Sequence, residues 1–289
     1  MKAGCCIFRN NPHPGLIPLF MITRLFLKLT DYPAFRRLVW KPVYELLAKY
    51  FRSKEWSLMN YGYAPSPGEP LLTLHPQDKV NRYPIQLYYY LAVKVRLGGC
   101  DVLEVGSGRG GGAACLKTYL DPKSITGLDI AGNAVELANE YFGSAGISFV
   151  RGSAEQLPFA DESFDVVINI ESSHTYGSVP QFLSEVKRVL RPGGYLLCAD
   201  IRTKSDMVLF TQQLKTCGLR MELQEDISDN VRRAIELEEP IKQQRITEHI
   251  PKSLQPIFKQ FAGVKGSKAH LQLASGELRY FRFVLQKPL

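Results

Sequence analysis

The stretch that decides the fold is DVLEVGSGRGGGAACLK, residues 101–117. It holds a short apolar run interrupted by Glu104, and then five glycines within seven residues. An apolar strand that leads into a helix through glycines lets a ligand approach the backbone, and the helix N-terminus attracts the ligand's anionic part. Gly106, Gly108 and Gly111 match G-x-G-x-x-G, the pattern of dinucleotide-binding folds. That match alone leaves an NAD-type oxidoreductase and other nucleotide-binding enzymes equally open.

After residue 101, apolar segments alternate with segments of helical character. Near-continuous apolar strands that alternate with helices are typical of a parallel sheet covered on both faces. The chain therefore predicts a doubly wound, Rossmann-like α/β fold with seven strands. The expected strands are 101–105, 124–130, 147–152, 163–171, 194–201, 219–227 and 278–286, and the expected helices are 82–97, 111–120, 131–146, 178–190, 205–218 and the charged segment 228–262.

The charge pattern and the order of segments divide the chain into three regions. Residues 1–80 are expected to form a basic helical arm and a lid loop, 81–227 a ligand-binding core, and 228–289 a helical lid and the last strand of the sheet. The net charge is +8, and residues 1–60 hold ten Lys or Arg and three Asp or Glu, which gives 10 − 3 = +7 and leaves 8 − 7 = +1 elsewhere. A nucleic-acid-binding protein more often carries its basic face within the folded module, so we expect no nucleic-acid partner.

Residues 16–29, LIPLFMITRLFLKL, are an apolar part of the arm. The segment is too short to span a bilayer, and Pro18, Arg24 and Lys28 interrupt it. A helix would place Arg24 and Lys28 on one side, which is the shape of an interfacial helix. The alternative is a lid helix packed on the protein's own core. We expect a cytoplasmic protein, and peripheral contact with an anionic membrane through residues 1–60 stays open beside the lid.

The six cysteines include no C-x-x-C pair, and no histidine lies at metal-ligand spacing from them. Several lie in apolar surroundings, such as LLCAD around Cys198. We therefore expect reduced, buried thiols and no metal site.

Glu104, two residues before the first glycine, distinguishes between the candidate classes of ligand. A buried carboxylate there attracts a ligand with a positive ammonium group and repels a pyrophosphate. With Gly106, Gly108 and Gly110 it forms E-x-G-x-G-x-G, which resembles the first motif of the class I S-adenosylmethionine-dependent methyltransferases. Asp129, at the end of the second expected strand, would accept hydrogen bonds from ribose hydroxyls in either interpretation.

Two further stretches resemble the same family, RGSAEQLPFADESFDVVINIESSH (151–174) and FLSEVKRVLRPGGYLL (182–197). Over residues 58–289 the chain is most similar to the phthiotriol dimycocerosate methyltransferases and to sugar and polyketide O-methyltransferases. The resemblance implies a seven-stranded methyltransferase sheet and S-adenosyl-L-methionine as cofactor. The residues expected to line the cofactor site are Tyr61, Tyr63, Glu104, Gly106, Ser107, Gly108, Gly110, Asp129, Ile130, Ser153, Ala154, Glu155 and Asn169.

One position departs from the family's pattern. Many relatives have Asp in the triplet GDA, where it accepts from the adenine amino group, whereas this chain has Ser153 in GSA. A hydroxyl is a weaker acceptor than a carboxylate. We therefore expect lower cofactor affinity, unless Glu155 supplies the missing acceptor.

His174 is the candidate general base for an alcohol or phenol acceptor. It follows the fourth expected strand, at the edge where open α/β sheets bind ligands, and imidazole suits general-base catalysis. Glu171, three residues earlier, would orient the imidazole or contact the cofactor. The resemblance supports this role through the shared E-S-x-H pattern. The alternative is that His174 is a structural histidine of the loop.

The stretch MNYGYAP suggests a lid over the cofactor. Tyr61 and Tyr63 flank Gly62, and aromatic faces favour a cation such as a sulfonium, although plain hydrophobic packing is the alternative. The arm and the segment 228–270 are rich in apolar side chains, which indicates a small hydrophobic acceptor. The expected function is O-methylation of a lipid-like or polyketide-like hydroxyl, with a C- or N-methyltransferase or a cofactor-binding cyclase as alternatives, and the oligomeric state stays open.

Overall fold

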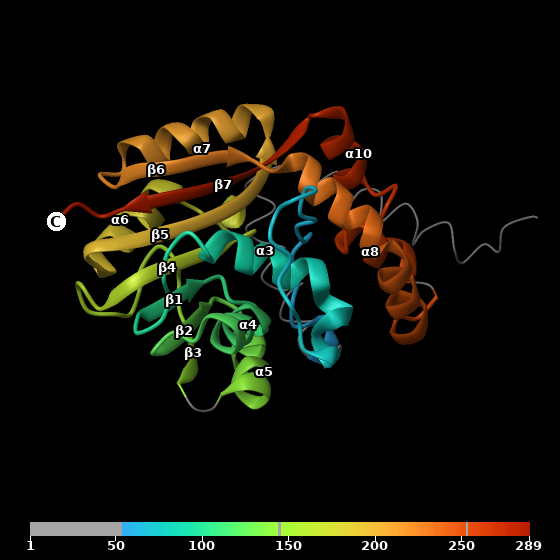
Figure 1. Cartoon of the computed structure of the whole chain (residues 1–289), viewed down its shortest axis with the longest axis horizontal. Coiled ribbons are helices and arrows are strands. Elements are labelled where there is room, and N and C mark those ends of the chain that lie inside the picture. Colours follow the sequence, from blue (N-terminus) through green and yellow to red (C-terminus); the bar gives the residue numbers. More distant parts are fainter. Residues whose placement is uncertain (1–53, 144–145, 253) are drawn as a thin grey trace, which may run out of the picture.

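The computed structural model describes residues 54–143, 146–252 and 254–289, and its centre is a seven-stranded sheet (Figure 1). The strand order is β3-β2-β1-β4-β5-β7-β6. This sheet confirms the doubly wound α/β fold expected from the sequence. The strands are β1 (Asp101–Val105), β2 (Ser124–Asp129), β3 (Ile147–Arg151), β4 (Phe164–Ile170), β5 (Leu190–Thr203), β6 (Arg220–Asp226) and β7 (Leu278–Gln286).

Strand β1 lies at the centre of the sheet because it pairs in parallel with both β2 and β4. Strand β5 continues the parallel order beside β4, with Ile170 opposite Ala199. Strand β3 pairs in parallel with β2, so the carboxyl ends of five parallel strands open at one edge, where the order of strands reverses. In open α/β sheets this edge is where ligands bind.

Strand β7 runs antiparallel to both of its neighbours, β5 and β6. Its pairing with β5 continues from Tyr195 opposite Gln286 to Thr203 opposite Leu278, so β5 extends beyond the expected range 194–201. Because β7 is reversed, it begins at the edge where β4 and β5 end.

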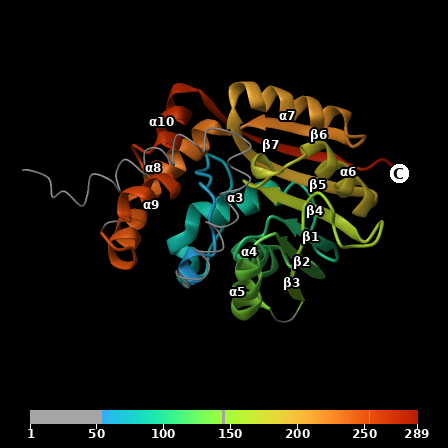
Figure 2. The ribbon, with the colours of Figure 1, turned by 180° about the vertical axis from the view of Figure 1, so that it is seen from behind.

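Helices cover both faces of the sheet (Figure 2). One face packs on α3 (Arg82–Ala92), α4 (Gly111–Leu120), α5 (Gly132–Phe142), α8 (Ser228–His249) and α10 (Lys268–Ser275). The other packs on α6 (Val179–Val189) and α7 (Lys204–Thr216). Helix α3 ends earlier than the expected residue 97, because a turn from Ala92 to Val95 closes it before Gly98.

The expected helical segment 228–262 consists of two helices, α8 and α9 (Gln255–Phe261). Helix α8 ends before Pro251, which is consistent with the bias of a residue before proline against the helical conformation. Helix α10, between this pair and β7, was not among the expected elements. A satellite apolar cluster of Ile246, Ile250 and Val264 holds the α8–α9 corner together.

The segment from Lys54 to Tyr63 runs from helix α9 to the glycine loop. Trp56 packs edge-to-face on Phe258 of α9, with ring centroids 6.3 Å apart. Further along, Ser57 lies so close to Gly111 that an added Cβ would be 2.7 Å from its carbonyl oxygen. The segment therefore joins helix α9 to the start of α4.

Several expectations concern the N-terminal arm. Residues 1–53, with the apolar segment 16–29, lie outside the described residues, so its role as lid or membrane contact stays a prediction, as do the three regional boundaries. In the part of the chain that the structure describes, no helix is both long enough and apolar enough to cross a bilayer.

The packing of α6 on the sheet can be tested at Phe182. Its side chain is fully buried, and it packs edge-to-face on Tyr176 with centroids 5.0 Å apart. We expect Phe182→Ala to lower the free energy of unfolding by about 3–5 kcal/mol, because it removes buried apolar surface and leaves a cavity. Urea denaturation measures this, and Ser184→Ala on the exposed side of the same helix should change little. Equal stability of the two variants would contradict this packing.

Candidate active site

The glycine loop after β1 is shaped by its hydrogen bonds to β2. The backbone N–H groups of Gly106 and Ser107 donate to the carbonyl of Leu128, and Gly108 N–H donates to Asp129 Oδ2 at 2.8 Å. Gly106, Gly108 and Gly110 all have positive φ, between 52° and 81°, which side chains rarely adopt. The glycines are therefore required by the turn itself, and the loop can approach a ligand closely.

Glu104 is buried inside β1, with 1% of its surface exposed. Its Oε1 accepts a hydrogen bond from the Tyr88 hydroxyl at 2.7 Å, and among the described residues Oε2 has no hydrogen-bond partner. Burial raises the pKa of Glu104 to about 7, although the hydrogen bond from Tyr88 opposes the rise. A buried carboxylate oxygen without a donor fits a ligand that brings a positive ammonium group.

The packing around Glu104 leaves no room for a side chain at the start of α4. An added Cβ on Gly112 would lie 2.2 Å from the Tyr88 hydroxyl and 2.3 Å from Glu104 Oε1, so only glycine fits there. Ser107 Oγ is also buried, and no hydrogen-bond partner for it occurs within the described ranges. The two unsatisfied atoms lie on β1 and on its loop, and they fit the amino-acid end of S-adenosylmethionine.

The residues expected around the ribose and adenine lie at the ends of β2 and β3. Asp129 Oδ1 accepts from Ala131 N–H at 2.9 Å, so this carboxylate already orients both its own turn and the glycine loop. Ile130 is 49% exposed beside it, and Ala154 is buried. The hydroxyl of Ser153 accepts a hydrogen bond from the N–H of residue 155, at 3.2 Å.

One carboxylate oxygen of Glu155 is engaged at the start of α6. Its Oε1 accepts from Ser178 N–H at 2.5 Å, at the residue that caps the start of α6. The cap commits one of its carboxylate oxygens. Whether Glu155 compensates for the serine of the GSA triplet stays a prediction.

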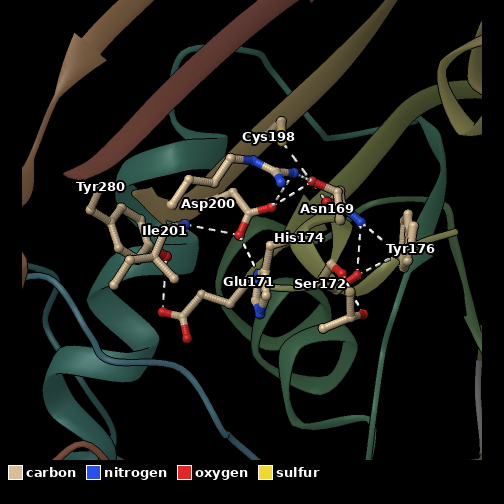
Figure 3. Close-up of polar contacts among 12 residues, drawn as sticks. Asn169, Glu171, Ser172, His174, Tyr176, Cys198, Asp200, Ile201 and Tyr280 are labelled. Carbon is tan, nitrogen blue, oxygen red and sulfur yellow. Dashed lines mark hydrogen bonds and ion pairs between the residues drawn. The ribbon is translucent and has the colours of Figure 1, made fainter. Parts of the chain in front are cut away.

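Asn169 ties the end of β4 to the end of β1. The amide is fully buried, and its Nδ2 donates to the Val105 carbonyl at 2.9 Å, to Ser172 Oγ at 3.0 Å and to the Tyr176 hydroxyl at 2.9 Å. Figure 3 shows these side chains gathered in the loop after β4. The geometry gives Asn169 a role in holding this loop beside the glycine loop.

His174 and Asp200 form a hydrogen-bonded pair at the same edge (Figure 3). His174 lies in the short helix η3 (Ser173–Thr175) after β4, and its Nδ1 is 2.7 Å from Asp200 Oδ1. The imidazole is 26% exposed, whereas Asp200 is fully buried. A carboxylate at Nδ1 holds the proton there and leaves Nε2 as the basic nitrogen.

Asp200 was not among the expected site residues. Burial alone would raise its pKa, but the nearby His174 and Arg202 and the hydrogen bonds to the carboxylate lower it to about 2. The acid in LLCADI, at the end of the fifth expected strand, could have indicated this pair. Strands four and five are neighbours in this fold, so an acid at the end of the fifth lies near a histidine that follows the fourth.

Glu171 joins the loop after β4 to the segment 54–63 and to strand β7. Its Oε1 accepts from Tyr61 N–H at 2.8 Å and from the Tyr280 hydroxyl of β7 at 2.9 Å. It adopts a positive φ of 47°, which is unusual for a residue with a side chain. Loss of hydration raises the pKa of Glu171 to about 7, although these two hydrogen bonds and the nearby His174 oppose the rise.

The two expected lid tyrosines lie in different surroundings. Tyr63 is 1% exposed, its ring stacks on Tyr90 with centroids 3.9 Å apart, and its hydroxyl donates to Glu69 at 2.7 Å. It therefore packs in the core. Tyr61 is only partly buried, and its ring lies against Gly263 of the helical lid.

No group of three or more His, Cys, Asp or Glu side chains in the described ranges could hold a metal ion. The cysteines that the structure describes are free thiols, at positions 100, 115, 198 and 217. Cys115 and Cys198 are buried, as expected, whereas Cys100 and Cys217 are only partly buried, and Cys5 and Cys6 lie outside the described residues.

Comparison with known proteins gives one consistent family. A family model described as a methyltransferase domain matches residues 103–198. The phthiotriol/phenolphthiotriol dimycocerosates methyltransferase of Mycobacterium tuberculosis is 39% identical over 250 residues, which cover 86% of this chain and 92% of that protein. The fatty-acid O-methyltransferase of Mycolicibacterium smegmatis is 35% identical over 245 residues, 84% of this chain and 89% of that protein.

Solved structures agree on the fold. The chain resembles a putative sarcosine dimethylglycine methyltransferase from Galdieria sulphuraria with a TM-score of 0.67 and 19% identity, over 83% of this chain and 98% of that one. The buried acid and glycine loop of β1 are thus found in a chain whose curated relatives are methyltransferases. The chain belongs to this family, and it is a class I S-adenosylmethionine-dependent methyltransferase.

Proposed function

We propose that the enzyme methylates a hydroxyl group of a hydrophobic, lipid-like or polyketide-like acceptor, with His174 as the general base. The observation that carries this proposal is the 2.7 Å contact between His174 Nδ1 and the buried Asp200 at the ligand-binding edge. A hydroxyl must lose its proton as it is methylated, and a neutral imidazole held in one tautomer can accept it.

The residues at this edge have different roles in the proposed reaction. When bound, S-adenosylmethionine supplies an electrophilic methyl group. Glu104 would hold the ammonium end, and Asp129 the ribose. Asp200 keeps the His174 ring in place with Nε2 available, so that His174 takes the acceptor's proton. The remaining contribution is positioning and exclusion of water by the lids.

The charges at the acceptor edge favour a hydroxyl over a carboxylate. Glu171 and Asp200 both present carboxylates there, and the nearby cation, Arg202, is already bound to Asp200 at 3.1 Å. An acceptor carboxylate would place a further negative charge beside Glu171, because Arg202 is already paired with Asp200. It would also need no general base, and the His174–Asp200 pair would then lack a chemical role.

The acceptor class is tested with purified enzyme, radiolabelled methyl donor, and a long-chain secondary alcohol beside the fatty acid of equal chain length. We expect label in the alcohol as a methyl ether and little in the fatty acid. Label in the acid alone, or on carbon or nitrogen of a related compound, would overturn the hydroxyl assignment.

The general base is tested with His174→Gln and Asp200→Asn. We expect kcat on the accepted alcohol to fall by about 10²–10⁴-fold in the first variant, because proton removal is lost. Asp200→Asn should lower kcat through the wrong imidazole tautomer. His249→Gln, on the exposed face of α8, is the matched control. Full turnover by His174→Gln, with cofactor affinity intact, would show that His174 is a structural residue.

Glu104→Gln tests the cofactor carboxylate. The folded-state pKa of about 7 lies above the ordinary 4.5, so ionisation costs folding stability from about pH 4.5 upward, and fully above pH 7. At pH 8 we expect the cofactor-free variant to be more stable than the wild type by about 3 kcal/mol, a gain that shrinks toward pH 5.

The same substitution should weaken cofactor binding. Loss of a charge-assisted contact lowers affinity for S-adenosylhomocysteine by roughly tenfold or more, as measured by calorimetry at pH 8. Glu136→Gln, an exposed carboxyl on α5, is the control for both measurements. A Glu104 variant that is less stable and still binds normally would contradict this assignment.

We also propose that the N-terminal arm gives the enzyme peripheral contact with anionic membranes. The support is its sequence, with four Lys or Arg and no Asp or Glu in residues 1–30. Deletion of residues 1–30 should reduce co-sedimentation with phosphatidylserine-containing vesicles, and added salt should weaken binding of the full chain. Vesicles of phosphatidylcholine alone are the control. Unchanged binding after the deletion would leave the arm as a lid.

A further inference from the structure

Arg202 contacts Asp200 on the side away from His174. Arg202, Ser173 and Asp200 are joined to one another by hydrogen bonds. Arg202 Nη2 donates to Ser173 Oγ at 2.7 Å and to Asp200 Oδ2 at 3.1 Å. Ser173 Oγ in turn donates to Asp200 Oδ2 at 2.5 Å. Ser173 immediately precedes His174, so the guanidinium contacts both the partner of the base and the loop that carries the base.

The Asp200 carboxylate is saturated with donors. Oδ1 receives His174 Nδ1 and the N–H of Ile201 at 2.9 Å, and Oδ2 receives Ser173 and Arg202. A carboxylate held at both oxygens cannot rotate away from the imidazole. The hydrogen bonds to Asp200 therefore also fix the orientation of the His174 ring.

The guanidinium is held in place by packing as well as by hydrogen bonds. The Arg202 side chain is 10% exposed, and its Cζ lies 4.0 Å from the ring centroid of Phe210 on α7. Among the residues described, its Nε has no hydrogen-bond partner although it is buried. A stacked and largely desolvated arginine acts on a nearby buried charge with little screening from water.

We propose that Arg202 is a positioning residue for the methyl transfer, which balances the charge of Asp200 so that the His174 imidazole stays neutral and basic. This inference rests on the proposed function. A lone buried carboxylate beside an imidazole stabilises the imidazolium, and a protonated ring cannot accept the acceptor's proton. With Arg202 paired to Asp200, the ring keeps its Nδ1 hydrogen bond without facing an unbalanced negative charge.

The charged and titratable groups around the imidazole come from three elements. Asp200 and Arg202 come from β5, Glu171 follows β4, and Tyr280 comes from β7. Burial raises the pKa of the Tyr280 hydroxyl well above its ordinary value, so it stays neutral. Glu171, with a pKa of about 7, titrates in the working range, and its contribution must be removed in the test.

The test replaces Arg202 by Lys, which keeps the charge, and by Met, which removes the charge and keeps much of the volume. Histidine-selective ¹⁵N NMR follows the imidazoles of the S-adenosylhomocysteine complex against pH, and His174→Gln identifies the His174 signal. We expect the His174 titration midpoint to rise by about one pH unit in Arg202→Met and to stay near the wild-type value in Arg202→Lys.

The pH–rate profile on the accepted alcohol should move in the same way. In Arg202→Met the acidic limb shifts upward by about one unit, which is about a tenfold loss of kcat/KM at a fixed pH on that limb. Ser173→Ala removes a hydrogen bond from Asp200 without removing charge, so its limb should stay in place. The shift should persist in a Glu171→Gln background.

The outcomes separate this inference from the proposed function. A His174 midpoint that is unmoved in Arg202→Met, and also in Arg202→Gln as a second neutral variant that can still donate to Ser173, overturns the role of Arg202. A normal rate in His174→Gln overturns the general base instead, and the effect of Arg202 on the titration would then still stand.

Discussion

Three carboxylates lie at the edge where β1, β4 and β5 end, and the protein compensates them to different degrees. Burying a charge is unfavourable unless a partner and hydrogen bonds replace water. Asp200 receives four donors and has a pKa of about 2, whereas the pKa values of Glu104 and Glu171 are both about 7. The compensated carboxylate acts as a fixed charge inside the protein. Glu104 and Glu171 receive fewer hydrogen bonds, so their buried charge is less fully compensated.

The sheet topology brings these groups together. Parallel pairing places the ends of β1 and β4 side by side, and the amide of Asn169 then joins the two loops that follow them. The reversal of β7 brings its first residues to the same edge, so that Tyr280 lies opposite Ile201 and donates to Glu171. A parallel last strand would have placed its start at the far edge.

The sequence predicted those parts of the site that are local in the chain. Glu104 and the three glycines of E-x-G-x-G-x-G stand within seven residues, and His174 lies four residues after the end of β4, so each motif coincides with a strand end. The sequence did not predict the roles of Asp200 and Arg202. Their position beside His174 depends on the pairing of β4 with β5, which cannot be derived from a local sequence pattern.

Side-chain direction was the other quantity that the sequence did not determine. Tyr61 and Tyr63 are two residues apart, and in a regular strand they would share a face. Gly62 has a φ of 81°, so the chain turns there, and Tyr63 enters the core while Tyr61 stays beside the lid. The direction of β7 and the break between α8 and α9 depend likewise on tertiary packing.

The segment 54–63 shows why this matters for function. It contacts α9 through Trp56, the glycine loop through Ser57 and Glu171 through Tyr61. This single stretch of backbone therefore ties α9, the start of α4 and the loop after β4 to one another.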